Sequence, residues 1–77
     1  MSLILKDKKG NVVDKTGYNV ESGNIFYKDK KVGTFEQEHD SNLGTYYLYI
    51  MNSGEEYHDH YADEKAIIQD NKLDLHS

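Results

Sequence analysis

Short apolar runs alternate with charged or glycine-rich segments over most of the chain. Runs of four to eight apolar or alternating residues, bounded by turn-forming residues, are typical of β-strands. On this pattern we predict five strands, at residues 2–7, 11–16, 24–29, 32–37 and 44–52.

The first four predicted strands belong to a near-repeat. Residues 5–13 resemble residues 27–35, and each unit places a Lys-Asp-Lys-Lys segment between two apolar stretches. A short charged segment between two strand-like runs predicts a β-hairpin. Two units are too few for a solenoid, so we expect two hairpins of one meander within residues 2–37.

The fifth predicted strand is apolar or aromatic on both faces. Alternation places Leu48 and Ile50 on one face with Tyr46, and the residues Tyr47, Tyr49 and Met51 on the other. Such a strand is covered on both sides or lies at an interface. We expect the first face in the core, and the Tyr47-Tyr49-Met51 face as an apolar surface that a second copy of the chain could bury. The predicted core comprises Leu3, Leu5, Ile25, Phe35, Leu48, Ile50 and Ile68.

The C-terminal third must supply the cover for this strand. Ser53 and Glu56 have the spacing of a capping box, and Tyr57, Tyr61 and Ile68 follow at helical intervals. We therefore predict a helix over about residues 54–70. The turn composition of residues 52–54 leaves an alternative, in which residues 55–61 return as a further strand.

Together these elements predict an α+β fold, with a small antiparallel meander of four or five strands and one C-terminal helix packed on one face. A small all-β barrel is the alternative if the helix does not form. A length of 77 residues allows one domain, spanning 1–77, with a thin core. Nine aromatic residues and no proline argue against disorder, and no cysteine is present to form a disulfide.

Nothing in the chain approaches the ~20 apolar residues of a membrane-spanning helix. The apolar stretch at the N-terminus is also too short for a signal peptide. We therefore expect a cytoplasmic protein without a membrane partner.

Charge divides the chain into two unlike halves. Residues 1–35 hold seven lysines and four acidic residues, whereas residues 36–77 hold two lysines and ten acidic residues, within a net charge of -5. An acidic half attracts a basic partner. Five of the seven tyrosines lie in that half, where repulsion opposes direct binding of nucleic acid, so none is expected.

The densest polar cluster lies within residues 55–64. We predict an acidic binding face made of Glu55, Glu56, Asp59, Asp63 and Glu64. Two histidines fall in the same segment, and on a strand His58 and His60 would point the same way and could chelate a divalent metal. The alternative is a solvated acidic face with neutral histidines and no cofactor.

Catalytic motifs are missing from the sequence. His39-Asp40 and His58-Asp59 could each supply an acid–base pair, but no nucleophile elbow, cysteine or phosphate-binding glycine loop accompanies them. We therefore predict a protein that is not an enzyme.

The composition, which is small, acidic, cysteine-free and rich in tyrosine, resembles that of accessory proteins from phages and mobile elements. The function predicted first is a non-catalytic protein-binding module whose acidic face blocks a basic, nucleic-acid-binding surface of a host protein, as a DNA mimic does. A metal-binding domain using His58 and His60 is the second hypothesis. A structural subunit that forms a homodimer through its tyrosine strand is the third.

Overall fold

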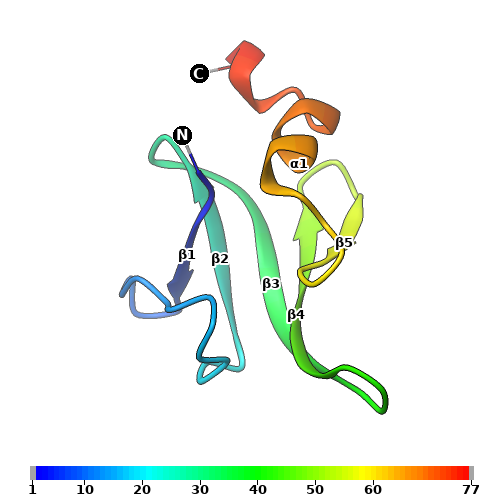
Figure 1. Ribbon diagram of the computed structural model, residues 1–77. Helices are drawn as coiled ribbons and strands as arrows, with labels where there is room; N and C mark the ends of the chain where they lie inside the picture. Colours follow the sequence, from blue (N-terminus) through cyan, green and yellow to red (C-terminus); the bar gives the residue numbers. More distant parts are fainter. Residues whose placement is uncertain (1, 77) are drawn as a thin grey trace.

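The computed structural model describes residues 2–76 of the chain, which fold as an antiparallel sheet with a short C-terminal helix (Figure 1). The strands are β1 (Ile4–Asp7), β2 (Ser22–Tyr27), β3 (Lys30–Asp40), β4 (Gly44–Met51) and β5 (Glu56–His58). They are ordered β1-β2-β3-β4-β5 in the sheet, so each strand pairs with its neighbour in sequence. This open meander confirms the predicted α+β class and excludes the barrel.

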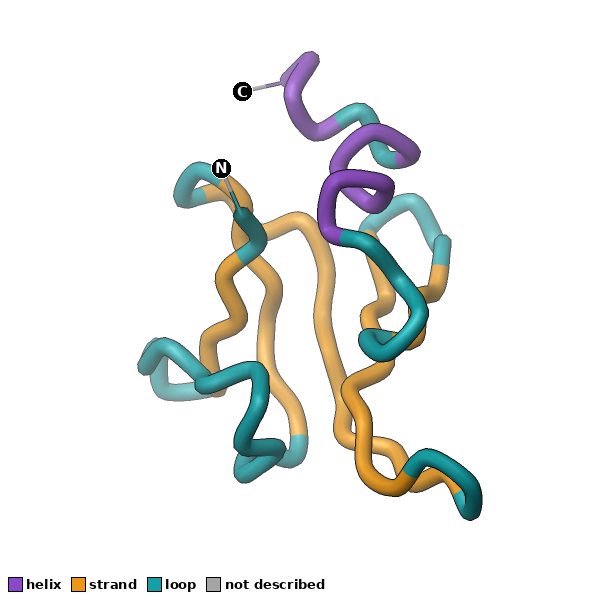
Figure 2. Tube along the Cα trace, viewed as in Figure 1, coloured by secondary structure: helices purple, strands orange, loops and turns teal. Residues whose placement is uncertain are grey.

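The chain ends in helix α1 (Glu64–Asp70) and the 3-10 helix η1 (Leu73–His76). Helix α1 and the long loop 8–21 cover one face of the sheet, which we call the inner face (Figure 2). Loop contacts support this placement, because the Tyr18 ring lies 4.9 Å from the ring of Tyr47 on β4. The opposite face, which we call the outer face, carries the half-exposed residues Tyr46, Leu48 and Ile50 of β4.

The second unit of the near-repeat forms the predicted hairpin. Tyr27 pairs with Lys30 across a two-residue turn, in which Lys28 and Asp29 have φ values of 52° and 65°. Positive φ at both central residues is the geometry of a type I′ turn, which matches the twist of the flanking strands.

The first unit turns back on β1 for only a few residues, with bonds from the Asp7 N–H to the Asn11 carbonyl and from the Val13 N–H to the Leu5 carbonyl, and the predicted strand at residues 11–16 was wrong. Only one isolated bridge, between Lys6 and Val12, joins this segment to β1. The Asp7 carboxylate accepts the N–H groups of Lys9 and Asn11, and the Asp14 carboxylate accepts that of Thr16. These local side-chain bonds compete with a strand ladder, and the loop crosses the inner face instead.

The predicted helix over residues 54–70 was wrong in its first half. Residues 52–55 form a turn in which Gly54 has a φ of 95°, and β5 then pairs with β4. The alternative of a returning strand therefore holds for residues 56–58. Helix α1 begins only after Asp63, whose carboxylate caps the N–H of Lys65.

The inner face holds the core, and the predicted faces of β4 were reversed. Tyr47, Tyr49 and Met51 are at most 4% exposed, whereas Leu48 and Ile50 are half-buried on the outer face. The reason is register, since Phe35 pairs with Tyr49 and both point inward. Tyr47, Tyr49 and Met51 are thus covered by the chain itself, which corrects their assignment to an interface. The other predicted core residues are buried: Leu3, Leu5, Ile25, Phe35 and Ile68.

Neither helix in the described part of the chain has the length and apolar character needed to cross a membrane.

Candidate functional site

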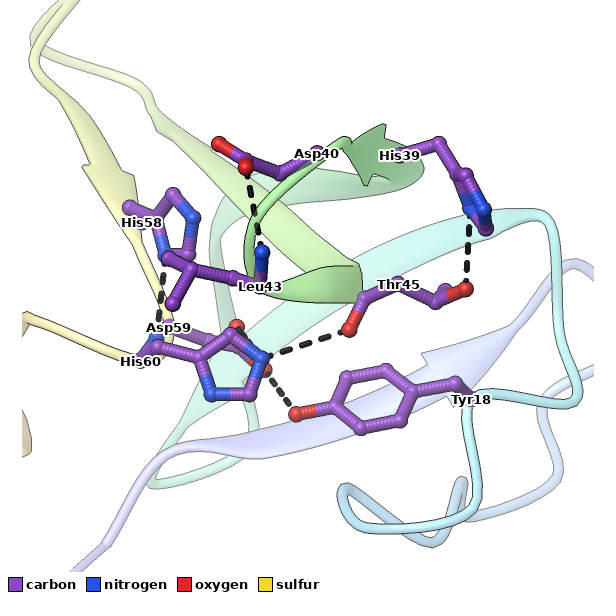
Figure 3. A network of polar contacts seen from close by, with 8 residues as sticks. All are labelled: Tyr18, His39, Asp40, Leu43, Thr45, His58, Asp59 and His60. Carbon is purple, nitrogen blue, oxygen red and sulfur yellow. Dashed lines mark hydrogen bonds and ion pairs between the residues drawn. The ribbon is translucent and has the colours of Figure 1, made fainter.

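Asp59 ties the end of β5 to the long loop that crosses the inner face (Figure 3). The Tyr18 hydroxyl donates a hydrogen bond of 2.9 Å to Asp59 Oδ2. His60 Nε2 donates to the Thr45 carbonyl at 3.2 Å and lies 3.9 Å from Asp59 Oδ1. Because the Asp59 side chain is only 9% exposed, it holds the fold together and is not part of a surface for a partner.

The burial of Tyr18, together with this hydrogen bond, makes stability depend on pH in the alkaline range. Burial, followed by the hydrogen bond to Asp59, raises the pKa of Tyr18 to about 12. Tyrosines of the unfolded chain ionise near pH 10, so between about pH 10 and 12 the folded state binds more protons than the unfolded state. The free energy of unfolding should therefore fall as pH rises through this window.

Urea denaturation at a series of pH values from 9 to 12 measures this dependence. The Tyr18→Phe variant should lose part of the slope. Tyr49, whose pKa is raised by burial, and Tyr27, whose pKa is raised by its hydrogen bond to Asp74, keep the remainder. Tyr61→Phe is the matched control, because that side chain is 74% exposed and should leave the slope unchanged. Equal slopes for wild type and Tyr18→Phe would contradict the prediction.

The five acidic residues predicted as one face do not form one. The Asp59 side chain is only 9% exposed and accepts a hydrogen bond from Tyr18, Asp63 caps α1, and Glu64 forms an ion pair and hydrogen bond with Lys15. Of the five predicted residues, only Glu55 and Glu56 are exposed and make no such contact with another described side chain or helix end.

The two histidines of the metal hypothesis lie close together but are already engaged. The His58 ring stacks on Tyr46 at 3.6 Å, and its Nδ1 accepts the backbone N–H of His60 at 3.2 Å. A ring nitrogen that accepts this bond is unprotonated, so the neutral ring carries its proton on Nε2, which is buried without a partner. His60 lies beyond β5 in a turn, and no group of three metal-binding side chains occurs in residues 2–74, whose side chains the structure describes.

The outer face of β3, β4 and β5 gathers carboxylates around an apolar stripe. Glu36 pairs with Leu48, Glu38 pairs with Tyr46, and Glu56 of β5 pairs with Ile50. Asp40 continues the row on β3 at the end of the strand. We call this surface the outer acidic face; it comprises Glu36, Glu38, Asp40, Tyr46, Leu48, Ile50, Glu56 and His58.

Near its centre, the outer acidic face carries carboxylates and no lysine. No lysine occurs anywhere in residues 32–64, which include all of β4 and β5. The lysine of β1 that shares this side of the sheet, Lys6, lies over the Phe26 ring at 4.9 Å. Hydrogen bonds from the backbone N–H groups of Asn42 and Leu43 lower the pKa of Asp40. These bonds favour the ionised form of the Asp40 carboxyl at the end of the row.

The sequence analysis did not recognise Glu36, Glu38 and Asp40 as one row. It ended the strand at residue 37, so that Glu36 was the only one of the three inside a strand and Glu38 and Asp40 fell in a linker. The structure continues β3 to Asp40, so every second residue from Glu36 onward presents a carboxylate on the outer face. This alternation of acidic residues was the signal available in the sequence.

Comparison of the chain with known protein families, curated proteins and solved structures finds no match. Function therefore has to be inferred from this chain's own residues.

Proposed function

We propose that this protein is a non-catalytic binding module that uses its outer acidic face to occupy a basic surface of a partner protein. The observation that carries the proposal is the carboxylate row of β3 beside the apolar stripe of β4. The stripe supplies area to be desolvated, and the carboxylates select and orient a basic partner.

The spacing of the row supports a nucleic-acid-binding surface as the target. Carboxylates at every second position of one strand stand about 6.7 Å apart, since a strand rises 3.3–3.4 Å per residue. A nucleic acid backbone also presents a regular line of negative charge to its proteins. A protein surface that binds phosphates with lysine and arginine would find a similar array on β3.

Charge also argues against the outer acidic face as a dimer contact. A two-fold axis through this face would bring Glu36, Glu38 and Glu56 of two copies together, which costs several kcal/mol when like charges meet across an interface. The homodimer hypothesis therefore loses both candidate surfaces, because the Tyr47-Tyr49-Met51 face is buried.

Affinity capture from a lysate with two charge-matched variants tests the proposal. The first variant neutralises the outer acidic face with Glu36→Gln, Glu38→Gln and Glu56→Gln. The second removes the same charge from exposed positions elsewhere, with Glu21→Gln, Glu55→Gln and Asp70→Asn.

Wild type and the second variant should capture the same basic proteins, and added duplex DNA should displace them. The first variant should lose these partners, and rising salt should weaken the wild-type complexes. Identical partners for both variants would show that the outer acidic face is not the binding surface, and loss by the second variant alone would favour the segment around Glu55.

A further inference from the structure

A cavity of about 240 Å³ lies at one end of the molecule, where three segments distant in sequence meet. They are the β2–β3 turn, the turn after β4, and the junction between α1 and η1. Its apolar wall is formed by Tyr27 and Val32 from the hairpin and by Leu73 from η1. It is separate from the outer acidic face, since Tyr27 and Val32 are buried core residues.

The neutral polar side chains around this cavity already have hydrogen-bond partners. Asn52 Nδ2 donates to the Lys31 carbonyl at 3.1 Å, and the Ser53 hydroxyl donates to Asn71 Oδ1. Asn71 Nδ2 in turn donates to the Ile67 carbonyl at 2.8 Å. These groups hold the three segments together and do not call for a ligand.

The two lysines of the cavity have weaker attachments. Lys28 Nζ lies 3.9 Å from Asp74 Oδ1, at the limit of an ion pair, and 5.4 Å from the centre of the Tyr27 ring, whereas Lys30 forms no ion pair within the described chain. Both ammonium groups therefore have donors to offer at the margin of an apolar cavity. An apolar wall with a few convergent charged groups is the usual make-up of a small-molecule site.

We infer that this cavity binds a small monocarboxylate with an apolar body of about one aromatic ring. The body would pack against Tyr27, Val32 and Leu73, and the carboxylate would accept hydrogen bonds from Lys28 and Lys30. The volume is below the roughly 300–1,000 Å³ of sites for drug-sized ligands, which sets the size of the body. A bound molecule would bridge the β2–β3 hairpin and the C-terminal segment, and would stabilise the fold.

The near-repeat offers a matched control for the lysines. Lys9 belongs to the corresponding Lys-Asp-Lys-Lys segment of the first unit, and it is an exposed turn lysine that does not line this cavity. The variant Lys28→Gln/Lys30→Gln is therefore compared with Lys9→Gln.

Titration of 15N-labelled protein with 4-phenylbutyrate, followed by amide NMR shifts, tests the inference. Saturable shifts are expected at residues 27–32, 52–53 and 71–73. The double variant should bind the probe about tenfold more weakly, because charge-assisted hydrogen bonds are lost. Lys9→Gln should bind as wild type does, as should the variant neutralised at Glu36, Glu38 and Glu56.

Two further probes distinguish the contribution of the apolar body to binding from that of the carboxylate. The uncharged 4-phenylbutanol should bind more weakly than the carboxylate and should not distinguish the lysine variants, and inorganic phosphate alone should leave these amides unshifted. No saturable shift up to about 10 mM 4-phenylbutyrate would overturn the inference, since binding would be too weak to matter. Equal affinity of wild type and the double variant would overturn the role of the lysines.

Discussion

Replacing Tyr47 with alanine is expected to lower the free energy of unfolding by about 3–5 kcal/mol. The side chain is fully buried, and its ring lies 4.9 Å from both the Tyr18 and the Phe35 rings. Its removal leaves a cavity where the loop 8–21, β3 and β4 meet. A 77-residue domain is expected to have a stability of roughly 4–12 kcal/mol, so this change removes a large part of it.

Tyr46→Ala is the control, because it makes the same change one residue earlier on the outer face. Tyr46 is half-exposed and its main ring contact is the stack on His58, so its loss should cost about 1 kcal/mol. Urea denaturation followed by circular dichroism compares the two variants. Equal losses, or a larger loss for Tyr46→Ala, would mean that β4 presents the opposite face to the core.

The sequence could not decide which face of β4 is buried. Both faces carry large apolar or aromatic side chains, so hydrophobicity alone gives no preference between Leu48 and Tyr49. The choice depends on the partner strand, where Phe35 pairs with Tyr49 while Glu36 pairs with Leu48. One charged residue on β3 thus assigns Leu48 to the outer face. The alternation of Phe35 and Glu36 decides the face only once the register that pairs them with Tyr49 and Leu48 is known.

Local chemistry predicted the hairpin of residues 27–35 correctly but not that of residues 5–13. The two units share their charged segment and both have apolar residues on either side of it, but only the second closes with a two-residue turn, between Tyr27 and Lys30. In the first unit Gly10 takes a φ of 92°, and the Asp7 carboxylate binds Lys9 and Asn11. The loop that follows carries turn residues in place of a second strand.

The acidic residues predicted as one face at residues 55–64 do not form one. Some of their side chains make contacts with distant residues that sequence spacing does not reveal. Asp59 bonds to Tyr18, 41 positions away, and Glu64 bonds to Lys15, 49 positions away. Both partners come from the loop that crosses the inner face. Pairing of this kind depends on the path of the loop, which only the folded structure defines.

The last prediction concerns Gly23 on β2, where a methyl group has no room. A Cβ atom at this position would lie 2.2 Å from the Lys6 carbonyl oxygen and 2.7 Å from the Phe35 ring. The first neighbour is backbone of the adjacent strand, and the second is a core side chain that is 1% exposed. Neither can move aside without separating β1 from β2, so Gly23→Ala should cost about 3 kcal/mol, the upper part of the usual range for overpacking.

Urea denaturation and amide hydrogen exchange together test this prediction. Because β1 is a four-residue edge strand, its amide protection should fall more than that of β3 and β4. Gly17→Ala is the matched control, since its Cβ would meet only side-chain atoms, the flexible Asn19 amide at 3.0 Å and Asp14 Oδ2 at 3.5 Å. Its stability should change by no more than about 0.5 kcal/mol. If Gly23→Ala behaved as Gly17→Ala does, β1 could not lie against β2 in the register that pairs Lys6 with Asn24.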